Sequence, residues 1–406
     1  MADQPHDPSG FQPARQRLIT LDALRGFAIL GILLPNMFAF AWPMAATMDP
    51  GVMGDSPWNG FAHSLNGTAF LGKFMFNFAM LFGAGVVLFD RKTTPTDRKP
   101  RLTDGWALWY RRCAALLVFG ILHAYLFWFG DILFAYAVAG LTLVWWVRKL
   151  PAGALIAGGL GLYTFGTLIT AGMIVLGVWA VSAGKTPESA LLGKPDLEIE
   201  GYLGTWLDAL KVRVGTVVFM QFFMMLFMPA IWGIMALGMG LTKAGVLTGE
   251  RSTRFHTVLC VLMLGMGVVT TGGAWLFING LDLQVPVGFV WQGFAQFVGI
   301  PLAIGYSQLI VLACRVPALR IPVQGLANVG RMALTNYLSH TLICTTIFYG
   351  YGLGYFASVP FPHLFGVIVA IWIFNFAFSA LWLKHFRFGP FEWLWRQLTY
   401  LGIETA

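Results

Sequence analysis

Long apolar runs dominate this chain and restrict the folds open to it. Each run has about 20 residues, enough to cross the roughly 30 Å hydrocarbon core of a bilayer as a helix. Ten are found, at 19–42, 66–89, 107–129, 131–147, 152–181, 214–242, 255–279, 288–314, 328–352 and 361–385. Only 11% of the 406 residues are charged, whereas soluble domains carry about 25%. The sequence therefore predicts an all-α polytopic membrane protein with about ten transmembrane helices, and it argues against a soluble enzyme or an outer-membrane barrel.

Basic residues alternate between loops as the positive-inside rule requires. With a cytoplasmic N-terminus, 20 of the 26 Lys and Arg fall in cytoplasmic segments and four in outer segments, while Arg25 and Lys73 lie inside spans. This pattern predicts cytoplasmic N- and C-termini. Residues 107–147 are also compatible with one broken helix, which would change the parity. The net charge of +8 forms no basic stripe, so we expect no nucleic-acid partner.

The runs divide the chain into five segments. We expect a cytoplasmic tail at 1–18, a five-helix membrane half at 19–181, an acidic outer loop at 182–213, a second five-helix half at 214–385 and an interfacial tail at 386–406. The last tail is aromatic and basic, which is typical of a helix anchored at the membrane surface. Glycines inside the spans, such as Gly83 and Gly159, indicate close helix packing.

Polar residues inside spans are candidates for function, because they are expensive to bury in a membrane. Asp22 and Arg25 share a helix face, where they form either a structural ion pair or a cationic contact for an anionic group. Asn36 follows Pro35, so it either satisfies the backbone freed by the proline or contacts substrate. Lys73 either extends to the surface or faces a cavity, where it could hold an anion or a carbonyl oxygen.

A histidine and an aspartate frame the turn after the third span. Gly130 and Asp131 fit a helix end followed by an N-cap, which would make Asp131 structural. His123 lies roughly 10 Å below that turn along the helix and is therefore expected to be buried. A buried histidine often bonds a backbone carbonyl, yet histidine is also the side chain best suited to proton transfer near neutral pH.

Further polar candidates are spread over the chain. Arg111 and Arg112 lie at the inner end of the third span, and His63 lies in the first outer loop. Asn336 and His340 are one turn apart in the ninth span, so they could face the same interior. No zinc ligand set or phosphate-binding glycine loop is present, and we expect no metal.

Three stretches resemble a known family. They are 17–32, which contains Leu21-Asp22-Ala23-Leu24-Arg25-Gly26, then Gly330 to Ser339, and Phe388 to Arg396. Together with His123 and Asp131 in their local contexts, they look like the YeiB-like family of bacterial inner-membrane proteins, known as domain-of-unknown-function family 418. The resemblance covers nearly the whole chain and implies a multi-pass protein of the inner membrane.

A more distant likeness implies a reaction. The opening Leu-Asp-x-x-Arg-Gly resembles the first helix of transmembrane acyltransferases of the heparan-glucosaminide acetyltransferase and acyltransferase-3 types, which transfer acyl groups from cytoplasmic acyl-CoA to a sugar or lipid. Asn36 falls where the first type has an active-site asparagine, and Trp58-Asn59-Gly60 is similar to its first outer loop. The catalytic histidine before that tripeptide is absent here, so either another histidine has its role, with His123 our first candidate and His63 the second, or this branch has lost acyl transfer.

The resemblance leads to one leading hypothesis and two rivals. We expect a membrane acyltransferase that uses acyl-CoA and a sugar, lipid or small-molecule acceptor at the periplasmic side. In it Arg25, Arg111 and Arg112 meet the CoA phosphates, and Trp58, Asn59, Asn336 and His340 are further substrate contacts. His123 is the base oriented by Asp131, and Asn36 or Lys73 stabilises the oxyanion. The rivals are a small-molecule transporter, with proton coupling at the same residues, and a non-enzymatic scaffold. Membrane lipids are expected partners, and a homodimer stays open.

Overall fold

The computed structural model describes residues 14–54, 56–93, 105–187, 193–281 and 287–401, and in these segments it is helical without strands. Short 3-10 or π helices are labelled η. The elements are α1 (Ala14–Ala41), α2 (Met44–Met48), η1 (Pro50–Met53), α3 (Pro57–Leu65), η2 (Asn66–Phe70), α4 (Lys73–Thr93), α5 (Gly105–Leu126), α6 (Leu133–Leu141), α7 (Leu143–Val147), α8 (Ala152–Ser182), α10 (Pro195–Leu203), α11 (Trp206–Leu226), α12 (Met228–Lys243), α13 (Thr253–Asn279), α14 (Val287–Ala313), η3 (Pro317–Leu319), α15 (Arg320–Arg331), α16 (Ala333–Phe348), α17 (Phe361–His385) and α18 (Pro390–Tyr400).

The predicted class, a polytopic membrane helix bundle, is confirmed. Within the described residues, seven helices are long and apolar enough to cross a membrane, and a pair bent by 100°, Val298–Ala313 with Pro317–Arg331, would make eight. Three of the ten apolar runs that were expected to be single transmembrane helices have a different structure. Residues 131–147 form the short helices α6 and α7, 214–242 is divided at Phe227, and 328–352 contains α16, which has only 16 residues. The helix α1 begins at Ala14, with its apolar span from Leu18, and the predicted outer loop at 182–213 contains α10.

Residues 107–147 turn back on themselves instead of forming one broken helix. A Cβ on Gly120 would meet Phe134, and one on Gly140 would meet Cys113. Further down, the ring of Trp109 is stacked on that of Trp145, with centroids 5.5 Å apart. These pairs run in opposite directions along the two segments, so α5 and the α6–α7 segment are antiparallel. The chain therefore reverses at the turn that contains Asp131.

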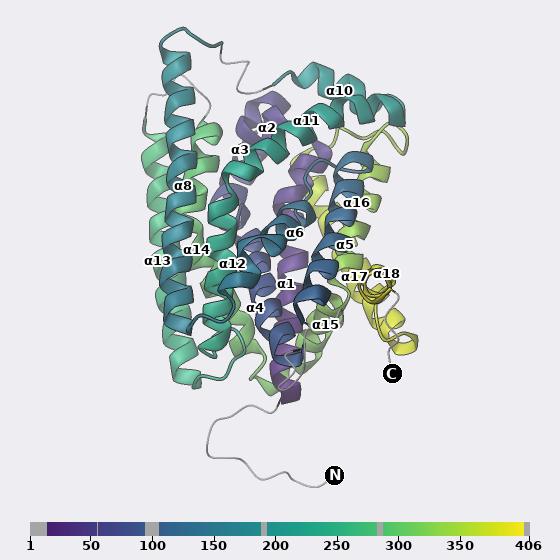
Figure 1. Cartoon of the computed structure of the whole chain (residues 1–406). Coiled ribbons are helices and arrows are strands. Elements are labelled where there is room, and N and C mark those ends of the chain that lie inside the picture. The colour runs from purple at the N-terminus through teal and green to yellow at the C-terminus, as the bar shows by residue number, and fades with distance from the viewer. Residues whose placement is uncertain (1–13, 55, 94–104, 188–192, 282–286, 402–406) are drawn as a thin grey trace.

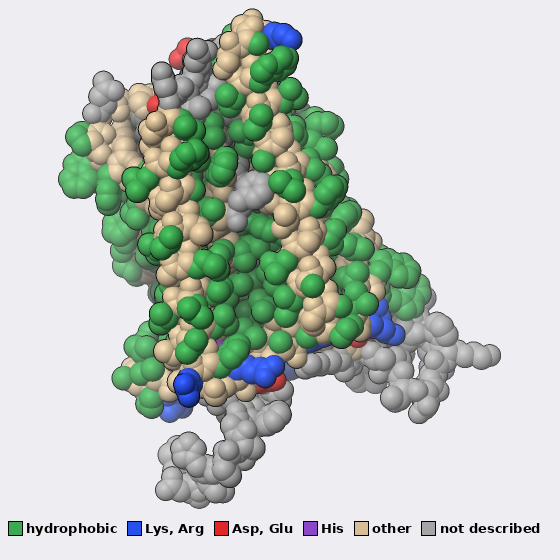
Figure 2. Space-filling view, turned by 90° about the vertical axis from the view of Figure 1, so that its left-hand side faces the viewer, with side chains coloured by type: hydrophobic (Ala, Val, Ile, Leu, Met, Phe, Trp, Pro, Cys, Tyr) green, Lys and Arg blue, Asp and Glu red, His purple; other side chains and the backbone are tan. Residues whose placement is uncertain are grey.

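The bundle has a buried centre and an apolar periphery. In the most apolar 18-residue stretch of each span, 61% of the residues are buried in the spans that contain α1 and α4. In α8 and α13 only 17% of these residues are buried. Figure 1 shows α1 and α4 in the middle, with α8 and α13 at one side. Hydrophobic side chains cover that side, and Lys and Arg gather at its lower rim (Figure 2). Such a surface suits a helix bundle that faces lipid.

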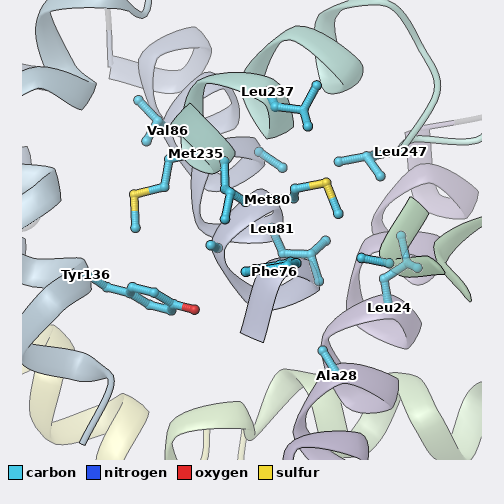
Figure 3. Close-up of a cluster of buried hydrophobic side chains, with 14 of the residues drawn as sticks. Leu24, Ala28, Phe76, Met80, Leu81, Val86, Tyr136, Met235, Leu237 and Leu247 are labelled. Carbon is cyan, nitrogen blue, oxygen red and sulfur yellow. The ribbon is translucent and has the colours of Figure 1, made fainter. Parts of the chain in front are cut away.

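Small residues let the central helices touch through their backbones. A Cβ on Gly83 of α4 would lie 2.1 Å from the carbonyl oxygen of Met235 in α12, and one on Gly159 of α8 would lie 2.7 Å from that of Gly233. Gly83 and Gly159 thus have the expected packing role, whereas a Cβ on the neighbouring span glycines Gly85, Gly158 or Gly161, for which the sequence predicts the same role, would meet nothing within 4 Å. Figure 3 shows the apolar cluster at this crossing, which includes Leu24, Ala28, Phe76, Met80, Leu81, Met235 and Leu237.

The two ends of the bundle differ. At the lower end in Figure 1, α1 begins, α17 ends and α18 lies beside α5. At the upper end, α2, α3 and α10 lie around the tops of the long helices. The turn between α5 and α6 also faces this end. These names, lower end and upper end, are used below.

Candidate functional site

A chain of three buried polar side chains links the α5–α6 turn to α16. His123 Nδ1 lies 2.8 Å from Asp131 Oδ1, and His123 Nε2 lies 2.8 Å from the Thr341 hydroxyl oxygen. Asp131 Oδ2 accepts a hydrogen bond from the Phe134 backbone N–H at 2.7 Å, in the first turn of α6, although the N-cap residue is Ile132 and not Asp131 as expected. The structure therefore brings His123 and Asp131 together and gives Asp131 a structural contact as well. We call the group Asp131, His123 and Thr341 the relay.

The carboxylate of Asp131 determines which ring nitrogen of His123 carries a hydrogen, because an ionised carboxylate can only accept hydrogen bonds. An ionised Asp131 can only accept, so its bond to Nδ1 places a hydrogen on that nitrogen. Nε2 of a neutral ring then carries a lone pair, and the Thr341 hydroxyl donates to it. The result is an imidazole with its basic nitrogen directed at a hydroxyl group. This is the arrangement that a general base needs, with the carboxylate holding the ring in position.

Aromatic side chains seal the relay. The Tyr337 ring lies 5.2 Å from the His123 ring, and its hydroxyl donates to the Gly130 carbonyl. The Trp128 ring lies 6.4 Å from the His123 ring and stacks on Phe40, with centroids 3.9 Å apart. His123 is only 2% exposed. A ligand can therefore reach Nε2 only after the helices or the Trp128 side chain move.

Asn36, the third predicted member, is not bonded to this group. Both ring nitrogens of His123 already have partners, in Asp131 and Thr341. Asn36 lies half-buried in α1, and the helix continues through Pro35 without ending. The expected meeting of imidazole, carboxylate and amide is thus reduced to imidazole and carboxylate.

Lys73 is fully buried at the start of α4. Its side chain is 0% exposed, so the alternative in which it extends to the surface is wrong. Its ammonium donates to the Gly67 carbonyl at 2.8 Å. The ion pairs of the described residues do not include it. A buried cation with one neutral partner is unusual, because the desolvation of the charge is poorly offset.

The three arginines expected to bind phosphates have protein partners at the lower end. Arg25 pairs with Asp22 at 2.7 Å, as the structural alternative predicts. The Arg112 guanidinium lies 3.7 Å from the centre of the Trp395 ring, and it interacts electrostatically with Arg25. Arg111 donates to the carbonyl of Leu401. Basic groups therefore do gather at this end, although each already has a contact.

The candidates in the first outer loop have separate roles. Asn59 is buried and donates to the carbonyls of Met53 and Gly54, so it holds the loop in shape. His63 Nε2 lies 3.0 Å from the Thr47 carbonyl oxygen. Trp58 is 60% exposed and contacts Phe61. None of these contacts joins the loop to the relay.

Asn336 and His340 do share one interior network, as their spacing predicts. The Asn375 side chain of α17 links them: its amide donates to Asn336 Oδ1 at 3.1 Å, and its oxygen lies 2.7 Å from His340 Nε2. Asn336 also donates to Ser379 at 3.0 Å. These groups satisfy one another, which is the usual state of buried polar residues. We interpret the network as the contact that joins α16 to α17.

Sequence reasoning missed Thr341, Tyr337, Asn375 and Ser379. The span 328–352 is rich in Thr, Ser and Asn, which marks α16 as a polar helix. However, Thr341 is 218 positions from His123 along the chain. The side of α16 that faces α5 depends on the rotation of the helix, and no local pattern gives it.

The motifs at the two ends of the chain meet at the lower end. Gly26 and Gly330 face each other where α1 crosses α15, and a Cβ on Gly330 would lie 1.8 Å from the Asp22 carbonyl oxygen. Glu392 of α18 accepts hydrogen bonds from the backbone of Leu334 and Thr335, at 2.6 and 3.0 Å, at the start of α16. The predicted C-terminal helix is thus fixed to the N-terminus of α16.

The fold and the lipid-type surface define a polytopic membrane protein, and comparison with known proteins gives its family. The chain is 34% identical to the uncharacterized protein YeiB of Escherichia coli (strain K12), over 95% of this chain and 96% of that protein. It is 31% identical to the uncharacterized protein YxaH of Bacillus subtilis (strain 168), over 97% of each. A family model described as a protein of unknown function, DUF418, matches residues 241–402. The chain belongs to this YeiB-like DUF418 family, which confirms the predicted resemblance. No solved structure matches it.

Proposed function

We propose that this protein is a bacterial inner-membrane acyltransferase that uses acyl-CoA, with His123 as the general base. The relay is the observation that supports this proposal. It presents a basic imidazole nitrogen to a hydroxyl group, and Asp131 holds the ring. The distant likeness of the first helix to transmembrane acyltransferases suggests the class of reaction.

The proposed reaction transfers the acyl group in one step. His123 Nε2 removes the proton from the hydroxyl or amine of the acceptor as that group attacks the thioester carbonyl. A new C–O or C–N bond forms and the C–S bond breaks. The proton then passes from His123 to the sulfur of the departing CoA thiolate. The carboxylate of Asp131 stabilises the imidazolium during the step.

The positions of the basic residues support entry of acyl-CoA at the lower end. Arg112 and His123 are both in α5, 11 residues and therefore about 16 Å apart along the helix axis. The pantetheine arm of CoA is long enough to reach from one to the other. Phosphates near Arg25, Arg111 and Arg112 could therefore coexist with a thioester at the relay, provided that the present contacts of these arginines open.

The first experiment measures acetyl-CoA and palmitoyl-CoA binding, and transfer of their labelled acyl groups to membrane extract. The purified full-length chain is used in detergent and in nanodiscs. We expect saturable binding of at least one thioester, and a loss of transfer of roughly 10²-fold or more in His123→Ala. His256→Gln is the matched control, because His256 is another buried histidine, bonded to Gln308 and away from the relay. Binding of neither thioester, or equal transfer by His123→Ala, would refute the proposal.

A second experiment separates the enzyme from the transporter. A carrier exchanges an unmodified solute across sealed vesicles, whereas the proposed enzyme releases free CoA thiol with each transfer. Release of thiol that depends on His123 supports the enzyme. Counterflow of a solute with no thiol release would instead assign these residues to transport.

A further inference from the structure

A buried arginine at the upper end has no carboxylate partner. Arg213 of α11 is 0% exposed, and its Nη1 donates to the Tyr125 carbonyl at 3.2 Å. Its Nε and Nη2 atoms have no hydrogen-bond partner among the described residues. These two atoms form the edge of the guanidinium that binds an oxoanion through two parallel hydrogen bonds. The edge best suited to a carboxylate or phosphate is therefore unused.

Two buried tyrosines lie beside Arg213. Tyr202 of α10 and Tyr349, just after α16, are stacked with ring centroids 4.5 Å apart. Both are almost fully buried, and neither hydroxyl makes a hydrogen bond of normal length and angle among the described residues. Burial, the largest effect, raises the pKa of each phenol, and the nearby Arg213 charge lowers it; the guanidinium also acts on the Tyr202 hydroxyl as a hydrogen-bond donor.

The acidic group that acts electrostatically on both tyrosines, Glu198, has another partner. Glu198 of α10 accepts a hydrogen bond from the Met44 backbone N–H at 2.7 Å. It forms no ion pair with Arg213 among the described residues, and burial raises the pKa of its carboxyl. Lys211, two residues before Arg213, does have a carboxylate, Asp208 at 2.9 Å. The protein thus neutralises the exposed cation of α11 and leaves the buried one without an anion.

Burial of a lone guanidinium is unfavourable unless something offsets the lost hydration. Unpartnered buried donors are rare in folded proteins, and three side chains that share this property in one place need a common explanation. Two N–H groups and two phenol O–H groups together match the acceptor oxygens of a carboxylate or a phosphate.

We propose that Arg213, Tyr202 and Tyr349 form a binding site for an oxoanion, a carboxylate or phosphate group, between α10, α11 and the end of α16. The site lies near the relay, because Arg213 binds the carbonyl of Tyr125, two residues after His123. It stands whether or not the chain transfers acyl groups. The oxoanion belongs either to a small solute or to the headgroup of a phospholipid.

The test uses the purified full-length chain in a maltoside detergent, which contains no oxoanion. Binding of radiolabelled inorganic phosphate, and of acetate in competition, is measured by equilibrium dialysis. We expect Arg213→Gln to weaken binding roughly tenfold or more, as loss of a charged hydrogen-bond donor does. Lys211→Gln removes the same charge from the same helix, and we expect it to change binding less than about twofold.

Two further variants keep the test decisive if Arg213→Gln does not fold. Tyr202→Phe and Tyr349→Phe remove hydroxyls that make no hydrogen bond of normal length and angle among the described residues, so folding should be preserved. Each should still weaken phosphate binding several-fold. Binding that is absent in the native protein, or equal in the native protein and in these variants, would overturn the site unless the lipid experiment below succeeds.

A lipid experiment distinguishes the two sources of the oxoanion. Nanodiscs with phosphatidylglycerol are compared with maltoside micelles. If a headgroup is the ligand, phosphatidylglycerol raises the thermal midpoint of the native protein more than that of Tyr349→Phe, and free phosphate has little effect. If a solute is the ligand, free phosphate produces that difference in detergent. Absence of the difference in both would refute the proposal.

Discussion

Thr341 occupies the position at His123 that the proposed acceptor must take. In the direct transfer proposed above, its hydroxyl only marks that position and plays no covalent part. We therefore expect Thr341→Val, which keeps the side-chain shape, to retain transfer within about tenfold of the native rate. The measurement is release of CoA thiol. Loss of transfer, together with an acylated Thr341 detected by mass spectrometry in the native protein, would instead make this residue the nucleophile.

Lys73 allows a test in which function and stability change in opposite directions. Replacement by Met removes a buried cation whose one partner in the described part of the chain is a carbonyl group, so the thermal midpoint should stay the same or rise. If Lys73 meets an anion or a carbonyl oxygen of the substrate, transfer should fall roughly tenfold or more. A variant that is less stable and equally active would assign Lys73 a structural role only.

The sequence predicts residue pairs well only where they are near one another along the chain. His123 and Asp131 lie on either side of one turn, but helix geometry alone separated them by roughly 10 Å, and their contact was expected from their chemistry; the fold of the turn then brings them together. Asn36 was expected beside them, but its position around the axis of α1 cannot be read from spacing. Nor could the sequence predict that Arg213 has no carboxylate partner among the described residues, because this depends on the positions of Glu198, Tyr202 and Tyr349 in other elements.

Among the helix crossings, that of α1 with α15 leaves the least room for a side chain. Adding a single Cβ atom at this crossing tests it. Gly330→Ala would place a Cβ 1.8 Å from the Asp22 carbonyl oxygen. Because backbone must move, we expect a loss of at least about 1–3 kcal/mol of stability. Gly161→Ala in α8, where a Cβ meets nothing within 4 Å, is the control and should be neutral. Thermal unfolding in detergent measures both, and similar midpoints would argue against this crossing.

The contact of α18 with α16 depends on one carboxylate. Glu392→Ala would leave the backbone N–H groups of Leu334 and Thr335 without their acceptor, and we expect a loss of about 1–3 kcal/mol. Trp393→Ala on the same helix is the control, because that side chain is 55% exposed. An equal effect of both replacements would show that α18 is held by its general packing instead.

This contact should also depend on pH. Burial raises the pKa of the Glu392 carboxyl above its usual 4.5, so the folded protein takes up the proton at a higher pH than the unfolded chain. The stability that this uptake contributes increases as pH falls through the folded pKa, and it is lost as pH rises. The destabilisation caused by Glu392→Gln should therefore be larger at a pH of about 4.5 than at about 7.5. A constant difference between the two proteins would contradict this.

Helix positions were predictable, but only some helix breaks were. Apolar runs identified α1, α5, α8, α13 and α17 closely, because length and hydropathy alone define a span. The break at Phe227 comes just before Pro229, which has no backbone N–H to donate and was expected to bend its helix. The break at Thr142 lies inside a continuous apolar run without a proline, so the sequence does not mark it.

At the scale of the whole molecule, the alternation of basic residues predicts which end faces the cytoplasm. Ala183, after α8, belongs to the outer side and Lys149, before α8, to the cytoplasmic side. In intact cells, a membrane-impermeant maleimide should label Ala183→Cys and should label Lys149→Cys only after lysis. Three of the four native cysteines are buried, and Cys314 is replaced to remove background. The reverse labelling pattern would invert the orientation.

The attachment of α18 to α16 means that the end of this chain completes a helix that begins more than fifty residues earlier. A protein terminated before Pro390 would lack more than a surface anchor, because the first turn of α16 would lose its acceptor. That helix supplies Thr341 to the relay and leads into Tyr349 at the oxoanion site. Construction of both sites therefore depends on α18, and chains that stop before Pro390 should be recognised as misfolded although every long apolar helix is already in place.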